Sequence, residues 1–137
     1  MTSAKAFGSG VPLVIDTSAW NRQRDPKVQG RWEATVSAGL LASCPVAALE
    51  ILAAARDERE FTLVEEALAA LPQAPVSSAV GQAALSACRE LGARRRIPAV
   101  DYLIAAAAAD RGFGVLHADK HFDLLAGVLG FESVRIG

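Results

Sequence analysis

Short apolar runs of β character alternate with longer helical segments along the whole chain. Runs in which consecutive residues are all apolar are typical of strands covered on both faces, as in parallel sheets. We expect strands at residues 11–15, 40–44, 76–77, 115–117 and 133–136, and helices over residues 45–54, 61–71, 78–92, 101–111 and 122–129, with weaker helical character over 27–38. Since such alternating elements are joined by crossover connections, the order predicts an α/β fold: a parallel sheet of about five strands flanked by helices.

The length of the chain, 137 residues, is that of a single domain. Residues 1–10 are small and glycine-containing, and we expect a flexible leader there, followed by one domain over residues 11–137. A composition of 52% hydrophobic and 21% charged residues excludes a disordered or collagen-like chain. The sequence shows neither a signal-peptide pattern nor an apolar run of membrane length, so we expect a cytoplasmic protein with no membrane partner.

The net charge of the chain is −1, so the domain carries no overall basic field. Affinity for nucleic-acid phosphates is electrostatic in origin, and any such contact must therefore come from a local patch. The run Arg94-Arg95-Arg96, just before the helix expected over residues 101–111, is one such patch. We expect it to bind nucleic-acid phosphates, the alternative being a solvated loop end without a role.

Four acidic residues stand at positions where an ordinary solvated charge is not expected. Asp16 and Asp119 follow the apolar strands 11–15 and 115–117, and ligands bind beyond the carboxyl ends of strands in an open parallel sheet. Glu50 and Asp101 lie within otherwise apolar helical segments. Acidic side chains are almost never fully buried unless they are paired.

Taken singly, each acid has a structural alternative: a helix cap for Asp16, a solvent-facing position for Glu50, a favourable interaction with the helix dipole for Asp101 and a turn for Asp119. Taken together, four carboxylates on separate elements predict a site for a hard cation. Ligation by oxygen alone suits Mg²⁺ or Mn²⁺ rather than Zn²⁺.

Four motifs that contain these acids resemble, in the same order, those of the VapC-type toxins among the PIN-domain ribonucleases. They are DTSA at residues 16–19, LEIL at 49–52, DYLIAA at 101–106 and HADKHFD at 117–123. The resemblance extends from about residue 11 to residue 136. It implies a PIN-like fold, a Mg²⁺- or Mn²⁺-dependent endoribonuclease, a VapB-like antitoxin partner and a homodimer. The mean hydropathy of +0.27 is also high for a small monomer, which favours a homodimer.

Carried over residue by residue, the resemblance gives a catalytic quartet of Asp16, Glu50, Asp101 and Asp119. Asp16 and Asp119 are expected as direct metal ligands, Asp101 as a ligand or as a base for the attacking water, and Glu50 as acting through a water. Ser18, and less directly Thr17, are expected to support Asp16 by hydrogen bonding. Many relatives have a further acid two positions after the fourth, where this chain has His121, which weakens the case for a second metal ion.

Two other classes of function compete with the ribonuclease. A haloacid-type phosphatase requires a DxDxT motif after the first strand, whereas this chain has DTSAW. A degenerate PIN-like module that only binds protein would be favoured by the loss of one of the four acids, and all four are present. The sequence therefore favours the nuclease, without identifying the RNA that it cuts.

Overall fold

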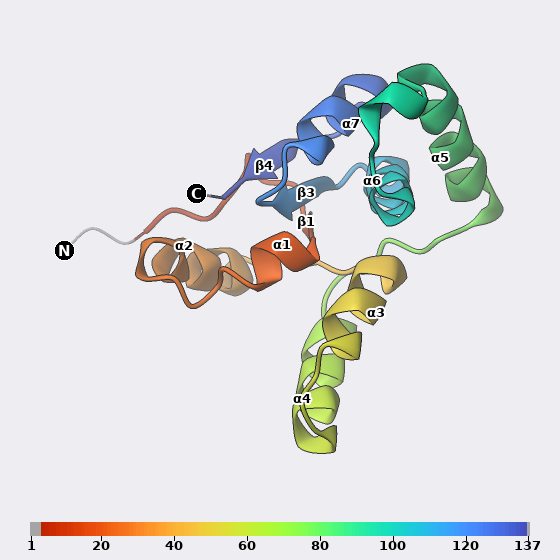
Figure 1. Ribbon diagram of the computed structural model, residues 1–137. Coiled ribbons are helices and arrows are strands. Elements are labelled where there is room, and N and C mark those ends of the chain that lie inside the picture. Colours follow the sequence, from red (N-terminus) through yellow and green to blue (C-terminus); the bar gives the residue numbers. More distant parts are fainter. Residues whose placement is uncertain (1–3, 137) are drawn as a thin grey trace.

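The computed structural model describes residues 4–136. The strands are β1 (Leu13–Ile15), β2 (Leu41–Ala42), β3 (Gly114–His117) and β4 (Ser133–Arg135). The helices are α1 (Thr17–Trp20), α2 (Pro26–Ser37), α3 (Pro45–Ala53), α4 (Glu58–Ala69), α5 (Ser78–Leu91), α6 (Ala99–Arg111) and α7 (His121–Leu129), with a short 3-10 turn, η1 (Ala93–Arg95), before α6 (Figure 1). No helix in this part of the chain is long and apolar enough to cross a membrane.

The strands form one parallel sheet in the order β2-β1-β3-β4. Leu13 lies opposite Leu41 on one side and Gly114 on the other, so β1 and β3 occupy the centre. The predicted α/β fold with a parallel sheet flanked by helices is confirmed. The sheet has four strands in the described residues, rather than about five.

The prediction of a strand at residues 76–77 is wrong. Ser77 is instead the N-cap of α5, and its hydroxyl accepts a hydrogen bond from the backbone N–H of Val80. Pro72 and Pro75 precede this stretch, and proline cannot donate to a strand ladder. Only an isolated bridge between Ser43 and Gln73 extends the sheet in this direction.

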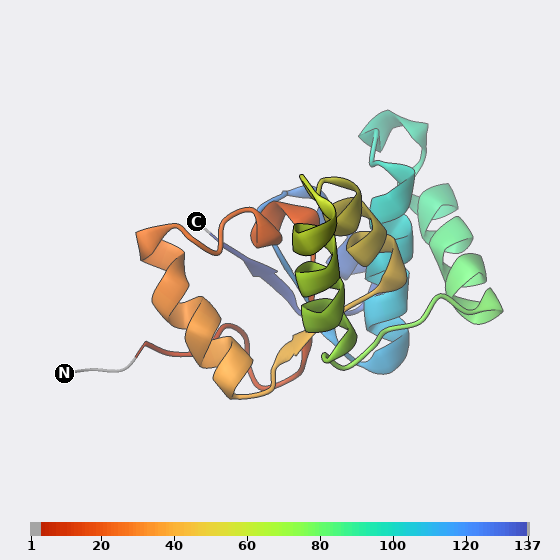
Figure 2. The same ribbon diagram turned by 90° about the horizontal axis from the view of Figure 1, so that it is seen from below.

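Helices cover both faces of the sheet (Figure 2). Leu13 and Ile15 point to one face, where they pack with Trp32 of α2. Val14 points to the other face and packs with Val115 and with the helices α3, α5, α6 and α7. The buried alanines of α6 allow this helix to approach its neighbours closely, and they are Ala105, Ala106, Ala107 and Ala108.

The segment before β1 packs on the domain from Phe7 onward. The Phe7 side chain is buried, and its backbone N–H donates to the hydroxyl of Thr35 in α2 at 2.8 Å. The backbone N–H of Ser9 donates to Glu132, just before β4, at 2.8 Å. The leader expected over residues 1–10 thus makes contacts in its second half, while residues 1–3 lie outside the described residues.

Candidate active site

Asp16 and Asp119 lie at the carboxyl end of the two central strands. Asp16 directly follows β1, and its backbone N–H donates to the carbonyl oxygen of Leu116 in β3 at 3.0 Å. Asp119 follows β3 by two residues. The chain leaves β1 toward β2 on one side and reaches β3 on the other, so this is the topological switch point at which open α/β sheets bind ligands.

Ser18 fixes the Asp16 carboxylate. Asp16 is the N-cap of α1, and its Oδ2 accepts hydrogen bonds from the backbone N–H of Ser18 at 3.1 Å and from the Ser18 hydroxyl at 2.5 Å. The same hydroxyl accepts a hydrogen bond from the backbone N–H of Ala118 at 2.9 Å. The expected support of Asp16 by Ser18 is therefore present in the structure.

Asp101 and Asp16 are the two buried members of the quartet, each with 6% of its surface exposed. It stands in the first turn of α6, which packs against α3, α7 and the two central strands. Burial, followed by the negative charges of Asp16 and Asp119, raises the pKa of Asp101 to about 7, and His121 opposes this shift. The charges of neighbouring acids thus add to the effect of burial on Asp101.

Glu50 is the exposed member of the quartet. It lies in α3, which packs against α1. Its partial burial and the charge of Asp16 raise the pKa of Glu50, while the neighbouring Thr17 hydroxyl lowers it. The Thr17 Oγ1 is itself buried and has no hydrogen-bond partner among the described residues. The expected hydrogen bond from Thr17 to the Asp16 carboxylate is therefore not formed.

His121 faces the quartet from the start of α7. Its Nδ1 lies 3.0 Å from Asp119 Oδ1 and 3.4 Å from Asp101 Oδ2. Its backbone N–H also donates to Asp119 Oδ1 at 3.0 Å. The sequence marks His121 only as a departure from the family pattern, and its proximity to Asp101 depends on how α6 packs against α7.

The residues present fit a divalent cation. Asp101, Asp119 and His121 each offer one ligand atom, and these three atoms lie within 4.8 Å of one another. At an effective dielectric constant near 20, two carboxylate charges this far apart repel by about 3 kcal/mol. Among the described residues, no lysine or arginine forms an ion pair with any of the four acids. A bound cation would supply the missing positive charge.

The other histidine, His117, is part of the scaffold. It is fully buried at the end of β3, and burial lowers its pKa. Its Nδ1 accepts from the backbone N–H of Asp119 at 3.1 Å, which leaves Nε2 to donate to the Ser133 hydroxyl at 2.6 Å. Ser133 in turn donates to Asp123 at 2.7 Å. Both ring nitrogens are therefore occupied by bonds that position the loop carrying Asp119.

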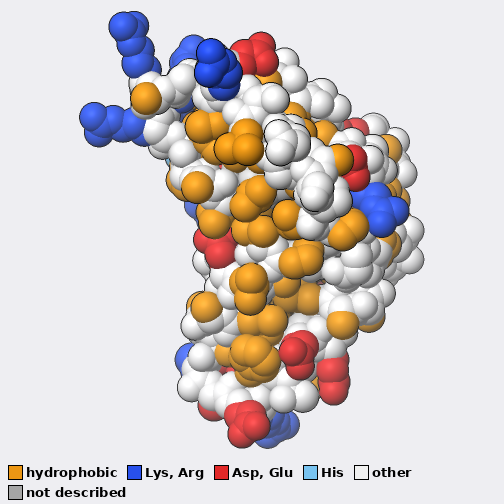
Figure 3. All heavy atoms as spheres, turned by 90° about the vertical axis from the view of Figure 1, so that its right-hand side faces the viewer, with side chains coloured by type: hydrophobic (Ala, Val, Ile, Leu, Met, Phe, Trp, Pro, Cys, Tyr) orange, Lys and Arg blue, Asp and Glu red, His pale blue; other side chains and the backbone are white. Residues whose placement is uncertain are grey.

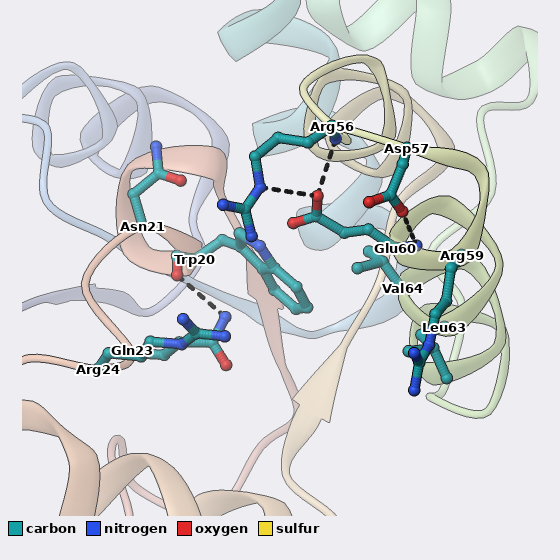
Figure 4. A pocket seen from close by; sticks show the side chains of 10 residues that line it. All are labelled: Trp20, Asn21, Gln23, Arg24, Arg56, Asp57, Arg59, Glu60, Leu63 and Val64. Atoms are coloured by element: carbon teal, nitrogen blue, oxygen red, sulfur yellow. Dashed lines mark hydrogen bonds and ion pairs between the residues drawn. The ribbon is translucent and has the colours of Figure 1, made fainter.

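A pocket of about 510 Å³ lies between α1 and the start of α4 (Figure 4). Trp20, one helical turn after Asp16, stands between arginines from three segments. Two acids of the pocket have partners: Glu60 pairs with Arg56 at 3.2 Å, and Asp57 accepts from the backbone N–H of Glu60 at 2.8 Å. The two remaining arginines of the lining have no ion pair among the described residues, and they are Arg24 and Arg59.

The arginine run predicted from the sequence is exposed. Arg94 and Arg95 end η1, and Arg96 has a left-handed backbone with φ of 50°. The run precedes α6 by three residues and so stands on the approach to the first turn that carries Asp101. The pocket around Trp20 was not predicted, because its arginines are scattered in the sequence rather than clustered.

Comparison with known proteins identifies relatives of this chain. Residues 13–128 match the PIN domain family. Ribonuclease VapC18 of Mycobacterium tuberculosis is 33% identical over 121 residues, which cover 85% of this chain and 88% of the relative. Ribonuclease VapC51 of the same organism is 37% identical over 121 residues, with coverage of 85% and 87%.

Solved structures share the fold. A DNA-bound VapBC complex from Salmonella typhimurium superimposes with a TM-score of 0.70 at 17% identity and covers 90% of this chain and 98% of its own. VapBC-5 from Mycobacterium tuberculosis gives a TM-score of 0.65 at 24% identity, with coverage of 92% and 99%. The fold described above is thus shared with these two solved structures.

Proposed function

This chain belongs to the PIN domain family and to its VapC ribonucleases, and from that premise we propose that it is a Mg²⁺- or Mn²⁺-dependent endoribonuclease, the toxin of a VapBC-like pair. The observation that carries the proposal is the grouping of Asp101 and Asp119 with His121, within 4.8 Å, at the end of the sheet where Asp16 also lies. The charges of the other three acids all raise the pKa of Asp101, which supports a shared site for the four.

In this proposal Asp16, Asp101 and Asp119 hold the cation directly, and Glu50 acts through a water. When bound, a divalent cation supplies an activated water nucleophile and neutralises charge on the phosphate and the leaving oxygen. Ser18 holds Asp16 in place, as its two hydrogen bonds indicate. The raised pKa of Glu50 suits it to accept a proton from the attacking water. The buried Thr17 hydroxyl has no hydrogen-bond partner among the described residues and is therefore available to bond a water next to Glu50.

We assign two positively charged surfaces of the protein to binding of the RNA strand. One is the predicted run Arg94, Arg95 and Arg96. The other is the pocket around Trp20, where Arg24 and Arg59 offer unpaired guanidinium groups and the indole offers a stacking face. Aromatic rings with neighbouring positive charge are the usual means of holding single-stranded nucleic acid. We place successive nucleotides over α1, between Asp16 and this pocket.

The proposed protein partners are a VapB-like antitoxin and a second copy of this chain, in the cytoplasm. Two of the solved structures that share the fold are titled as VapBC structures, which supports the antitoxin. An apolar groove of about 430 Å³ between α5 and α6 supports the homodimer; Leu85, which lines it, is 66% exposed. On this side of the molecule hydrophobic side chains form a strip that begins over α5 and reaches α4 (Figure 3).

The test compares the wild type with Asp101→Asn, which removes one charge with little change of shape. Both proteins are purified free of other chains and metal, then mixed with a fluorescence-quenched single-stranded RNA in Mn²⁺, Mg²⁺ or EDTA. We expect cleavage by the wild type only with a cation, and a loss of at least a hundredfold in Asp101→Asn. The metal-free variant should melt no lower than the wild type, and its stabilisation by Mn²⁺ should shrink, because ligand binding stabilises only the state that binds.

Asp110→Asn is the matched control, since Asp110 is an exposed acid at the other end of the same helix. It should cleave and bind Mn²⁺ as the wild type does. An Asp101→Asn protein that cuts RNA at the wild-type rate would contradict the proposed site. A wild type that binds RNA but never cuts it would favour the protein-binding module instead.

A further inference from the structure

We propose that His121 is a nitrogen ligand of the bound cation, and that this site therefore prefers a transition-metal ion such as Mn²⁺ or Co²⁺ to Mg²⁺. The inference rests on the proposed function, since it concerns the same cation. It assigns a role to the one position of the HADKHFD motif where this chain departs from the acidic pattern that it resembles.

The spacing of the three candidate ligand atoms is that of neighbours around one ion. Adjacent ligands of an octahedral cation with bonds of about 2.1 Å lie about 3.0 Å apart. His121 Nδ1 lies 3.0 Å from Asp119 Oδ1 and 3.4 Å from Asp101 Oδ2. All three atoms lie within 4.8 Å of one another. The two spacings from His121 thus match those of adjacent ligands on one ion.

The His121 Nδ1 is buried and faces two carboxylate oxygens, and the ring makes no hydrogen bond of acceptable geometry among the described residues. A ring nitrogen beside two carboxylates calls for a positive charge at that place, which a proton on the ring or a bound cation supplies. A cation meets this need for all three groups at once, whereas a proton on Nδ1 pairs with one carboxylate.

Backbone contacts hold this side chain in place. The His121 backbone N–H donates to Asp119 Oδ1 at 3.0 Å, so the two ligands belong to one turn. His121 is also the first residue of α7, which packs against α6, the helix of Asp101. The position of His121 relative to Asp101 is thus fixed by the packing of α7 against α6.

An imidazole ligand changes which cation binds best. Mg²⁺ prefers oxygen ligands and keeps several waters, whereas imidazole nitrogen suits the transition metals. For a given site with nitrogen and oxygen ligands, affinity rises from Mn²⁺ to Co²⁺. Replacing an acid by histidine also removes one negative charge from the site, which further weakens the hold on Mg²⁺.

The test measures metal binding to the full chain directly. Mn²⁺, Co²⁺ and Mg²⁺ are titrated into metal-free wild type and His121→Asp by calorimetry, and pulsed electron paramagnetic resonance of the Mn²⁺ complex detects a coupled nitrogen nucleus. We expect the wild type to show imidazole nitrogen coupling and to bind Mn²⁺ at least tenfold more tightly than Mg²⁺. His121→Asp should lose the coupling, and its ratio of Mn²⁺ to Mg²⁺ affinity should fall about tenfold.

The chain offers an internal control, because it contains two histidines and both ring nitrogens of His117 are already hydrogen-bonded. His121→Asn, which keeps a polar side chain without a ring, should also lose the coupling while it melts within a few degrees of the wild type. A wild type that binds Mn²⁺ and cleaves RNA without nitrogen coupling would overturn the role of His121 alone. A wild type that binds no divalent cation would overturn the proposed function as well.

Discussion

Ser18 and Ala118 lie 100 residues apart in the chain, and the Ser18 hydroxyl accepts a hydrogen bond of 2.9 Å from the Ala118 backbone N–H. The same hydroxyl donates to Asp16 Oδ2. One side chain thus joins the segment after β1 to the segment after β3. Since Asp119 follows Ala118 directly, this bridge sets the distance between two of the acids that the proposed mechanism uses.

Ser18→Ala should therefore disturb both stability and catalysis. It removes the hydroxyl bond to a carboxylate and leaves the Ala118 N–H without its acceptor, which costs about 1–3 kcal/mol in the free energy of unfolding. We expect cleavage to fall at least tenfold, because Asp16 loses a bond that orients it. Chemical denaturation and the quenched-RNA assay measure the two effects. Ser86→Ala, at an exposed position of α5, is the control and should change neither.

The main part of the site could be predicted from the sequence because parallel strands end at a common edge. Apolar strands followed by Asp16 and Asp119 place both acids at that edge whatever the helices do. Asp101 and Glu50 could be added because an acid within an apolar helix requires a partner. The strand order puts β1 and β3 side by side, so that the residues following these two strands are neighbours.

Other features depend on packing that local pattern does not encode. His121 meets Asp101 only because α7 lies against α6. The pocket around Trp20 unites side chains from α1 and α4, and no run in the sequence marks it. The strand expected at residues 76–77 failed for a local reason, since the Ser77 side chain bonds the first turn of α5 in place of a sheet neighbour.

The contribution of Asp101 to the stability of the metal-free protein should fall as the pH rises from about 4 to about 7. Asp101 has its ordinary pKa near 3.8 when unfolded and a pKa of about 7 when folded. Within that window the folded state binds more protons, so its stability falls with increasing pH and then levels off above 7. Thermal unfolding in EDTA, measured at intervals from pH 4 to pH 8, checks this slope.

Asp101→Asn isolates that contribution, because all other titrating groups remain. The difference in melting temperature between variant and wild type should grow in favour of the variant as the pH rises, and should be largest above pH 7. Excess Mn²⁺ should raise the melting temperature of the wild type most strongly at the same high pH. A difference that does not change with pH would show that Asp101 is not buried among the other acids.

Gly114→Ala should destabilise the sheet without touching the acids. A Cβ at Gly114 would lie 2.5 Å from the carbonyl oxygen of Glu132 and 2.7 Å from Leu13 Cδ2, closer than real contacts allow. Relief requires the backbones of two strands to separate, and such overpacking costs about 1–3 kcal/mol or more. Gly127→Ala, in α7, meets no atom within 4 Å and should stabilise slightly. Equal unfolding midpoints for the two variants in urea would contradict the close contact of Gly114 with Glu132 and Leu13.

The two proposed RNA contacts can be separated by their salt dependence. In an Asp101→Asn background, which we expect to bind RNA without cutting it, anisotropy of a labelled single strand is measured at several salt concentrations. Each phosphate contact adds about 0.7 to the slope of log affinity against log salt. The pair Arg24→Gln and Arg59→Gln should lower the slope by about 1.4 if both arginines contact phosphates. The triple change of Arg94, Arg95 and Arg96 to Ala should lower it by about 2.

Trp20→Ala should act differently, because stacking involves no counterion. It should weaken binding by about 1–3 kcal/mol for one stacked base and leave the salt slope unchanged. Circular dichroism checks that the fold survives the loss of the edge-to-face contact with Trp32, whose ring centre lies 6.2 Å away. Arg111→Gln, at the far end of α6, is the charge control and should change neither quantity. If the pocket variants bind RNA like the wild type while the Arg94–Arg96 variant does not, the strand runs past α6 and the pocket serves another ligand.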